Sequence, residues 1–163
     1  MLYLLKPCIM KKILPYAIPI ALCFLLGFIA SYLQTDAINN WYPYLNKPAL
    51  TPPNMAFPIA WSILYVCMSI SIGLIYTNYP QWRKPFVWLF SIQLLFNFGW
   101  SIAFFYLQNP LLGMIDILIL DVLVIWYAVK AYPVSKEASI LFWPYIIWIL
   151  FATYLNGYIW MYN

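Results

Sequence analysis

Long runs of uncharged residues, separated by short polar segments, recur five times along this chain of 163 residues. Each run holds about 20 residues or more, enough for a helix rising ~1.5 Å per residue to cross a hydrocarbon core of ~30 Å. The pattern therefore predicts an all-α integral membrane protein, a five-transmembrane-helix bundle forming a single domain over 1–163. We place the helices at about 13–34, 56–79, 85–107, 110–131 and 138–161.

The connection between the first two helices, predicted at about 36–55, has an unusual composition. It reads WYPYLNKPALTPPNM from Trp41 to Met55, mixing prolines with aromatic residues. Proline lacks an N–H donor and restricts the residue before it, so a regular helix is excluded here. Because the stretch is also too apolar for an ordinary solvated loop, we interpret it as a rigid lid over the end of the bundle.

Basic residues are distributed unequally between the two sides of the predicted membrane. Seven of the eight fall on one side: Lys6, Lys11, Lys12, Arg83, Lys84, Lys130 and Lys136. Lys47 in the lid is alone on the other. Since basic loops favour the cytoplasmic side, we expect the N-terminus inside, with the lid and the C-terminus outside. A cleaved signal peptide is the competing interpretation of the N-terminus, but no A-x-A site follows the first apolar run.

Composition excludes several classes of protein. Hydrophobic residues make up 66% of the chain and charged residues 7%, against about a quarter charged in soluble domains. Histidine is absent, and Cys8, Cys23 and Cys67 lack metal-ligand spacing. We therefore expect no metal site, no resident cofactor and no His-dependent catalytic pair. The net charge is +4, but the basic residues lie between the apolar runs rather than in one patch, so nucleic acid is not an expected partner.

Two predicted helices carry polar and aromatic residues on one face. Gln93, Asn97 and Trp100 share a face of the third helix, and either hydrogen bonding between helices or a ligand-lining face accounts for them. A second stripe lies on the fifth helix at intervals of three and four residues: Tyr145, Trp148, Ala152, Asn156 and Trp160. We interpret this stripe as a pocket wall for a flat apolar ligand, with packing against another helix as the alternative.

Asp116 and Asp121 are the carboxylates inside the predicted spans. Five residues apart, they lie about 140° apart around a helix and do not form a catalytic pair. Asp116 lies about one turn from its helix start, where a carboxylate is favoured by the helix dipole. For Asp121 the sequence offers no partner.

Several motifs, taken in order, carry a family resemblance. The lid contains W-Y-x-x-L-x-K-P-x-x-T-P-P from Trp41 to Pro53. The further matches are Trp61, Tyr65, residues 93–100, Phe104, Phe105, Asp116 and residues 144–156. Together these motifs resemble the TspO/MBR family, which includes tryptophan-rich sensory proteins and the mitochondrial translocator protein, also called the peripheral benzodiazepine receptor.

The resemblance implies a five-helix bundle, commonly a homodimer, with one ligand cavity closed by the lid. It also implies binding of porphyrins such as protoporphyrin IX and haem, and of synthetic isoquinoline carboxamide or benzodiazepine ligands. Carried over by position, the ligand-binding residues are Tyr42, Pro52, Trp61, Tyr65, Asn97, Trp100, Trp148 and Ala152. Two departures are Phe98, which replaces a residue that is polar in some bacterial relatives, and Tyr158, which lacks the following basic residue of the cholesterol-recognition pattern.

From the resemblance we expect a receptor or sensor in a bacterial cell membrane, with a flat hydrophobic ligand, the lipid bilayer and a second copy as partners. The first alternative is an enzyme that breaks down porphyrin in light and oxygen, with Trp61 and Trp148 as reacting residues; no acid–base pair supports it. The second is a porphyrin transporter, although no inverted repeat or broken helix is visible.

Overall fold

Helices joined by short turns account for nearly the whole chain in the computed structural model. It describes the backbone of residues 2–163 and the side chains of residues 12–163, so the side chains of Lys6 and Lys11 lie outside the described residues. The elements are α1 (Leu2–Asn40), η1 (Tyr42–Tyr44), α2 (Ala56–Asn78), η2 (Pro80–Trp82), α3 (Arg83–Ser101), η3 (Ile102–Tyr106), α4 (Pro110–Ala131), α5 (Lys136–Ile140) and α6 (Trp143–Tyr162).

Among the described residues, five segments are long and apolar enough to cross a membrane, which confirms the predicted class of an all-α, five-span membrane protein. They are Lys12–Asn40, Ala56–Asn78, Pro80–Tyr106, Pro110–Ala131 and Lys136–Tyr162. The third span combines η2, α3 and η3, and the fifth combines α5 and α6. Two irregularities inside spans were not predicted: the π-helical segment η3 in the third span and the break at residues 141–142 in the fifth.

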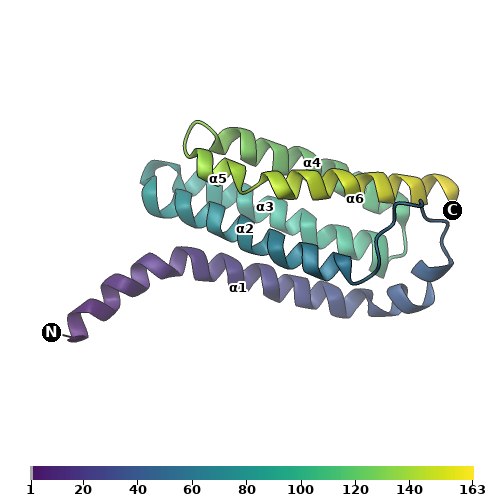
Figure 1. The fold of residues 1–163 in the computed structure, drawn as a ribbon, viewed down its shortest axis with the longest axis horizontal. Helices are drawn as coiled ribbons and strands as arrows, with labels where there is room; N and C mark the ends of the chain where they lie inside the picture. Colours follow the sequence, from purple (N-terminus) through teal and green to yellow (C-terminus); the bar gives the residue numbers. More distant parts are fainter. Residues whose placement is uncertain (1) are drawn as a thin grey trace.

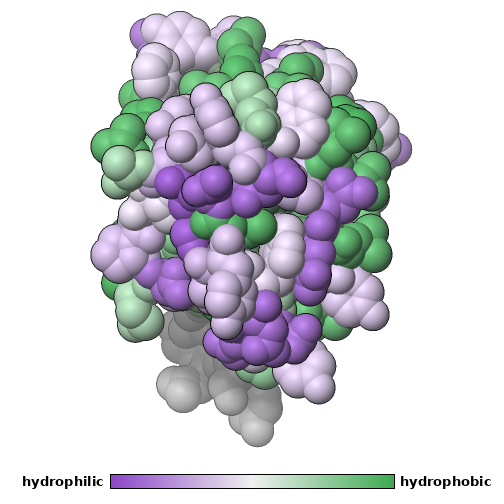
Figure 2. All heavy atoms as spheres, turned by 90° about the vertical axis from the view of Figure 1, so that its right-hand side faces the viewer, coloured by the Kyte–Doolittle hydropathy of each residue, from purple (hydrophilic) through white to green (hydrophobic). Residues whose placement is uncertain are grey.

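The spans form a bundle in which α1 lies along one side (Figure 1). α1 packs on α2, α3 and η3, whereas α4 packs on α3 and α6. The N-terminus lies at one end of the bundle and the C-terminus at the other, beside the lid (Figure 1). Figure 2 shows the lid end, where hydrophilic residues gather around a small hydrophobic area. Exposed polar residues of this end include Asn40, Asn46, Gln108 and Asn163.

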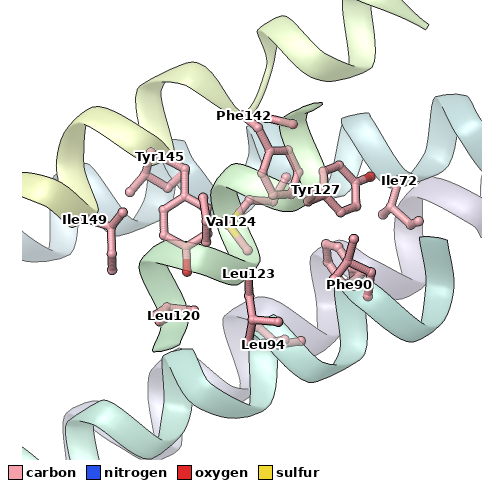
Figure 3. Close-up of a cluster of buried hydrophobic side chains, with 14 of the residues drawn as sticks. Ile72, Phe90, Leu94, Leu120, Leu123, Val124, Tyr127, Phe142, Tyr145 and Ile149 are labelled. Carbon is pink, nitrogen blue, oxygen red and sulfur yellow. The ribbon is translucent and has the colours of Figure 1, made fainter. Parts of the chain in front are cut away.

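Tight aromatic packing fills the half of the bundle away from the lid (Figure 3). Tyr127 of α4 stacks on Phe142, with ring centroids 3.8 Å apart, and meets Phe86 edge-on at 5.2 Å. The Tyr127 hydroxyl lies 3.2 Å from Ser71 Oγ, which donates to the carbonyl of Ala138 at 2.7 Å. Because this half is tightly packed, the space for a ligand lies in the half under the lid.

The lid begins later than predicted, because α1 continues to Asn40 and the connection is 41–55 rather than 36–55. Asn40 Nδ2 donates to Asp36 Oδ1 at 2.7 Å, a contact between residues one helical turn apart that supports the extra turn. Ala37 is buried in the same turn. Helical structure also precedes the predicted start at residue 13, because α1 begins at Leu2.

The fifth span starts at Lys136, earlier than the predicted 138, because Ser135 caps it by accepting the N–H of Ala138 at 3.2 Å. The helix breaks at residues 141–142, and α6 then starts with Pro144 in its first turn. Proline is tolerated there because the first N–H groups of a helix have no partner within it.

Candidate ligand-binding cavity

A cavity of about 460 Å³ lies under the lid, between α1, α2 and the end of the third span. Its wall combines side chains from these helices with Tyr42 and Asn54 of the lid. Five of the eight predicted ligand-binding residues line it: Tyr42, Trp61, Tyr65, Asn97 and Trp100. The sequence therefore identified much of the α2 and α3 walls before their relative positions were known.

Aromatic rings make up the inner wall of the cavity. Trp61 lies beside Tyr65, with ring centroids 5.7 Å apart, and meets Tyr145 edge-on at 5.9 Å. Trp100 stacks on Phe104 at 5.3 Å with the ring planes 16° apart. Each ring is held by another ring behind it, so the wall presents fixed flat faces to a ligand.

Asn97 and Trp100 also hydrogen bond across the bundle. Asn97 Nδ2 donates to the Tyr145 hydroxyl at 2.7 Å, and Trp100 Nε1 donates to Asn156 Oδ1 at 2.9 Å. The sequence left two interpretations open for this face of α3: hydrogen bonding between helices, or the lining of a ligand site. Both apply to Asn97 and Trp100, since these side chains line the cavity and also join α3 to α6. Among the described residues, no hydrogen bond reaches Asn97 Oδ1, which leaves it as an acceptor for a ligand.

Tyr42 fixes the lid to η3. Its ring packs on Phe105 and Phe104, with centroids 5.6 and 6.5 Å away. Lys47 Nζ lies 4.6 Å from the Tyr42 ring centroid and donates to the Tyr42 carbonyl at 2.8 Å. Burial raises the pKa of the Tyr42 phenol and so further favours its neutral hydroxyl form.

Pro52, Trp148 and Ala152 do not line this cavity. Pro52 lies half-buried within the lid. Trp148 packs edge-on against Phe57 at 5.8 Å. Ala152 lies behind Trp100, where it lines a separate space of about 30 Å³. The fifth-span stripe therefore does not form a wall of this cavity, because Trp100 stands between α6 and the cavity.

The α1 wall was missed from the sequence, because none of its residues was among the predicted ligand-binding residues. Its lining residues are Phe24, Leu26, Gly27, Phe28, Ala30, Ser31, Gln34 and Ile38. The signal was present, because Gly27, Ser31 and Gln34 interrupt an otherwise bulky apolar run at intervals of four and three residues. Gly27 also admits Tyr65: a Cβ built on it would lie 2.7 Å from Tyr65 Cε2.

The intramembrane acids lie outside the cavity wall. Asp121 Oδ2 accepts the Thr153 hydroxyl at 2.8 Å, which supplies the partner that the sequence could not name. Asp116 Oδ1 lies against Gly99, and Asn109 caps the N-terminus of α4 by accepting the N–H of Leu112 at 3.0 Å. Gln93 is fully buried, and neither atom of its amide has a partner among the described residues.

A family model described as TspO/MBR matches residues 19–161. The chain belongs to the TspO/MBR family. This confirms the resemblance drawn from the lid and helix motifs. The tryptophan-rich protein TspO of Archaeoglobus fulgidus is 43% identical over 139 residues, covering 85% of this chain and 90% of the relative. TspO of Chlorobaculum tepidum is 38% identical over 150 residues, covering 90% and 94%.

A more distant TspO/MBR relative is the translocator protein of Sus scrofa. It is 29% identical over 140 residues, covering 84% of this chain and 83% of the relative. The family match over residues 19–161 spans the lid, the helices that line the cavity and nearly all of the fifth span.

Proposed function

We propose that this TspO/MBR protein is a membrane receptor or sensor that binds tetrapyrroles, such as protoporphyrin IX and haem, and benzodiazepine-type ligands under the lid. The cavity carries the proposal: it combines about 460 Å³ with ring faces from Trp61, Tyr65 and Trp100 and an acceptor on Asn97. Ligand pockets typically enclose about 300–1,000 Å³ and pair apolar walls with a few polar groups.

The wall of the cavity supports recognition through flat faces rather than through charge. Among the described side chains, none that lines the cavity is charged. Lys47, the basic residue of the lid, donates to the carbonyls of Tyr42 and Pro43. A buried carboxylate without a partner would be costly, so the acidic groups of a porphyrin stay at the polar lid end while its macrocycle enters.

Light-driven porphyrin breakdown is the second candidate function. The observation that favours it is the presence of two indoles, Trp61 and Trp100, in the cavity wall. A photoexcited porphyrin held there would lie next to oxidisable rings, whereas Trp148 does not line the cavity. The reaction would then depend on the bound ligand as the light absorber rather than on an acid–base pair.

Fluorescence titration tests the receptor function. Purified protein is titrated with protoporphyrin IX in the dark, and saturable quenching of tryptophan fluorescence is expected. Trp61→Phe should weaken binding by up to about tenfold, because it trims a stacking face. Trp148→Phe is the matched control and should leave the Kd unchanged. Wild-type protein that shows no saturable quenching would overturn the proposal.

Two further measurements with the same titration test how the acidic groups are recognised and whether porphyrin is broken down. Protoporphyrin IX dimethyl ester should bind within about threefold of the free acid, since the cavity wall is uncharged; a much stronger preference for the acid would contradict this mode of recognition. Illumination then tests breakdown. A light-dependent loss of the porphyrin spectrum that disappears in Trp61→Phe, but not in Trp148→Phe, would favour the enzyme.

A further inference from the structure

The side chain of Asn163 joins the end of the fifth span to the lid. Its Oδ1 accepts the backbone N–H of Asn46 at 2.9 Å. Its Nδ2 donates to the carbonyl of Asn46 at 3.2 Å and to the carbonyl of Ile159 at 2.9 Å. One amide thus satisfies both backbone groups of a single lid residue. Only one orientation of the amide does so, which fixes the assignment of its oxygen and nitrogen.

This contact anchors lid residues 45–55, whose other hydrogen bonds run to residues nearby in the sequence. The hydroxyl and N–H of Thr51 donate to the carbonyl of Pro48, and Lys47 donates to the carbonyl of Tyr42. Among the hydrogen bonds of the described residues, those to Asn163 alone link lid residues 45–55 to a part of the chain distant in sequence; the others run within the lid, to η1 or to the first residue of α2. The first part of the lid is anchored separately, by Tyr42 on η3.

We propose that Asn163 is a latch that holds the lid over the cavity and sets how fast ligands enter and leave. The proposal rests on the proposed function of the cavity as a ligand site. Asn163 does not line the cavity, so the latch restrains the lid without touching the ligand. A contact that is equally strong with and without ligand shifts no binding equilibrium. Its loss therefore accelerates entry and exit together.

Stopped-flow quenching with protoporphyrin IX measures this effect. In Asn163→Ala, association and dissociation rates should both rise about fivefold, as expected for the loss of a few exposed hydrogen bonds, with the Kd within twofold of wild type. Asn163→Asp replaces the donor by a carboxylate oxygen that faces the carbonyls of Asn46 and Ile159, so its rates should rise at least as much as in Asn163→Ala. Asn46→Ala is the matched control, because the latch uses only the backbone of Asn46; its rates should match wild type.

Unchanged rates in Asn163→Ala, or a weaker Kd without faster association, would overturn the latch. Hydrogen exchange provides a readout that needs no ligand. The amide of Thr51 donates within the lid, to the carbonyl of Pro48 at 2.9 Å. It should exchange faster in Asn163→Ala and not in Asn46→Ala.

The two proposals fail in distinguishable ways. If wild-type protein binds no porphyrin, the proposed function fails and hydrogen exchange still decides whether Asn163 restrains the lid. If porphyrin binds but exchange of the Thr51 amide is unchanged by Asn163→Ala, the latch is wrong and the receptor function stands.

Discussion

Gly27 shows how the lack of one side chain shapes the cavity. A Cβ at this position would lie 2.7 Å from Tyr65 Cε2 and 3.0 Å from the Tyr65 hydroxyl oxygen. Tyr65 is also held by Trp61 and by Phe24, whose ring centroid is 5.6 Å away. The ring therefore has little freedom to move aside, and the fit between α1 and α2 depends on glycine.

We predict that Gly27→Ala destabilises the protein by about 1–3 kcal/mol, the usual cost of overpacking, and weakens porphyrin binding by displacing Tyr65. Gly157→Ala is the control, because its Cβ would meet only Met114 at 3.7 Å, and alanine is the better helix former. Thermal unfolding in mild detergent, followed by porphyrin titration, measures both effects. A Gly27→Ala variant as stable as Gly157→Ala would show that Tyr65 yields easily.

Individual residues of the site were predictable where a motif or a helical face marked them. Trp61 and Asn97 were found in this way and line the cavity. Trp148 and Ala152 were placed with them because periodicity identifies the face of a helix but not what lies opposite it. Trp100, hydrogen bonded to Asn156, occupies the space between α6 and the cavity, and its orientation was not contained in the local sequence.

At the scale of elements, helix ends followed known sequence signals more closely than helix interiors did. Asn109 and Pro110 mark the start of α4 as N-cap and first helical residue. The π-helical segment η3 was not predicted: the N–H of Leu107 bonds to the carbonyl of Ile102, five residues back, at 2.9 Å. Such a segment adds one residue to a helical turn. Its apolar sequence, IAFFY, fits an ordinary α-helix equally well.

The turn after η3 contains a residue in a strained backbone conformation. Gln108 has φ 49°, the left-handed region that costs a residue with a Cβ about 1–2 kcal/mol. We predict that Gln108→Gly stabilises the protein by up to about 1 kcal/mol, the gain being reduced by the greater freedom of glycine in the unfolded chain.

Gln108→Val should destabilise the same turn, because a β-branched residue is rarely found at positive φ. Leu107→Gly is the matched control: with φ −84° its backbone needs no glycine, so this change should lower stability. Thermal unfolding midpoints in detergent compare the three variants with wild type. Equal midpoints for Gln108→Gly and Gln108→Val would show that the turn stores no strain.

The whole molecule joins a packed half to a hollow half under the lid, and this division was not predictable from the five spans alone. It depends on which helices are neighbours: the cavity lies at the lid end between α1, α2 and the end of the third span, and no residue of α4 or α6 lines it. Two glycines allow helices to approach closely inside the bundle: Gly27 lies against Tyr65 and Gly73 lies against Tyr16, in each case on the neighbouring helix. These glycines therefore serve contacts within the bundle, and the homodimer stays a prediction from the family resemblance.

Charge divides the molecule along its long axis and predicts its orientation in the membrane. The turns at the end away from the lid carry Arg83, Lys84, Lys130 and Lys136 (Figure 1). The lid end carries Lys47. Because basic loops are retained in the cytoplasm, we predict that the lid and Asn163 face the outside.

Reporter fusions measure this orientation. Alkaline phosphatase fused after Asn163 should be active, and green fluorescent protein fused there should be dark, because each reporter folds on one side only. A fusion after Pro133, in the turn between α4 and α5, should give the opposite pattern and serves as the control. Fluorescence from the Asn163 fusion would reverse the orientation, and ligands would then reach the cavity under the lid from the cytoplasm.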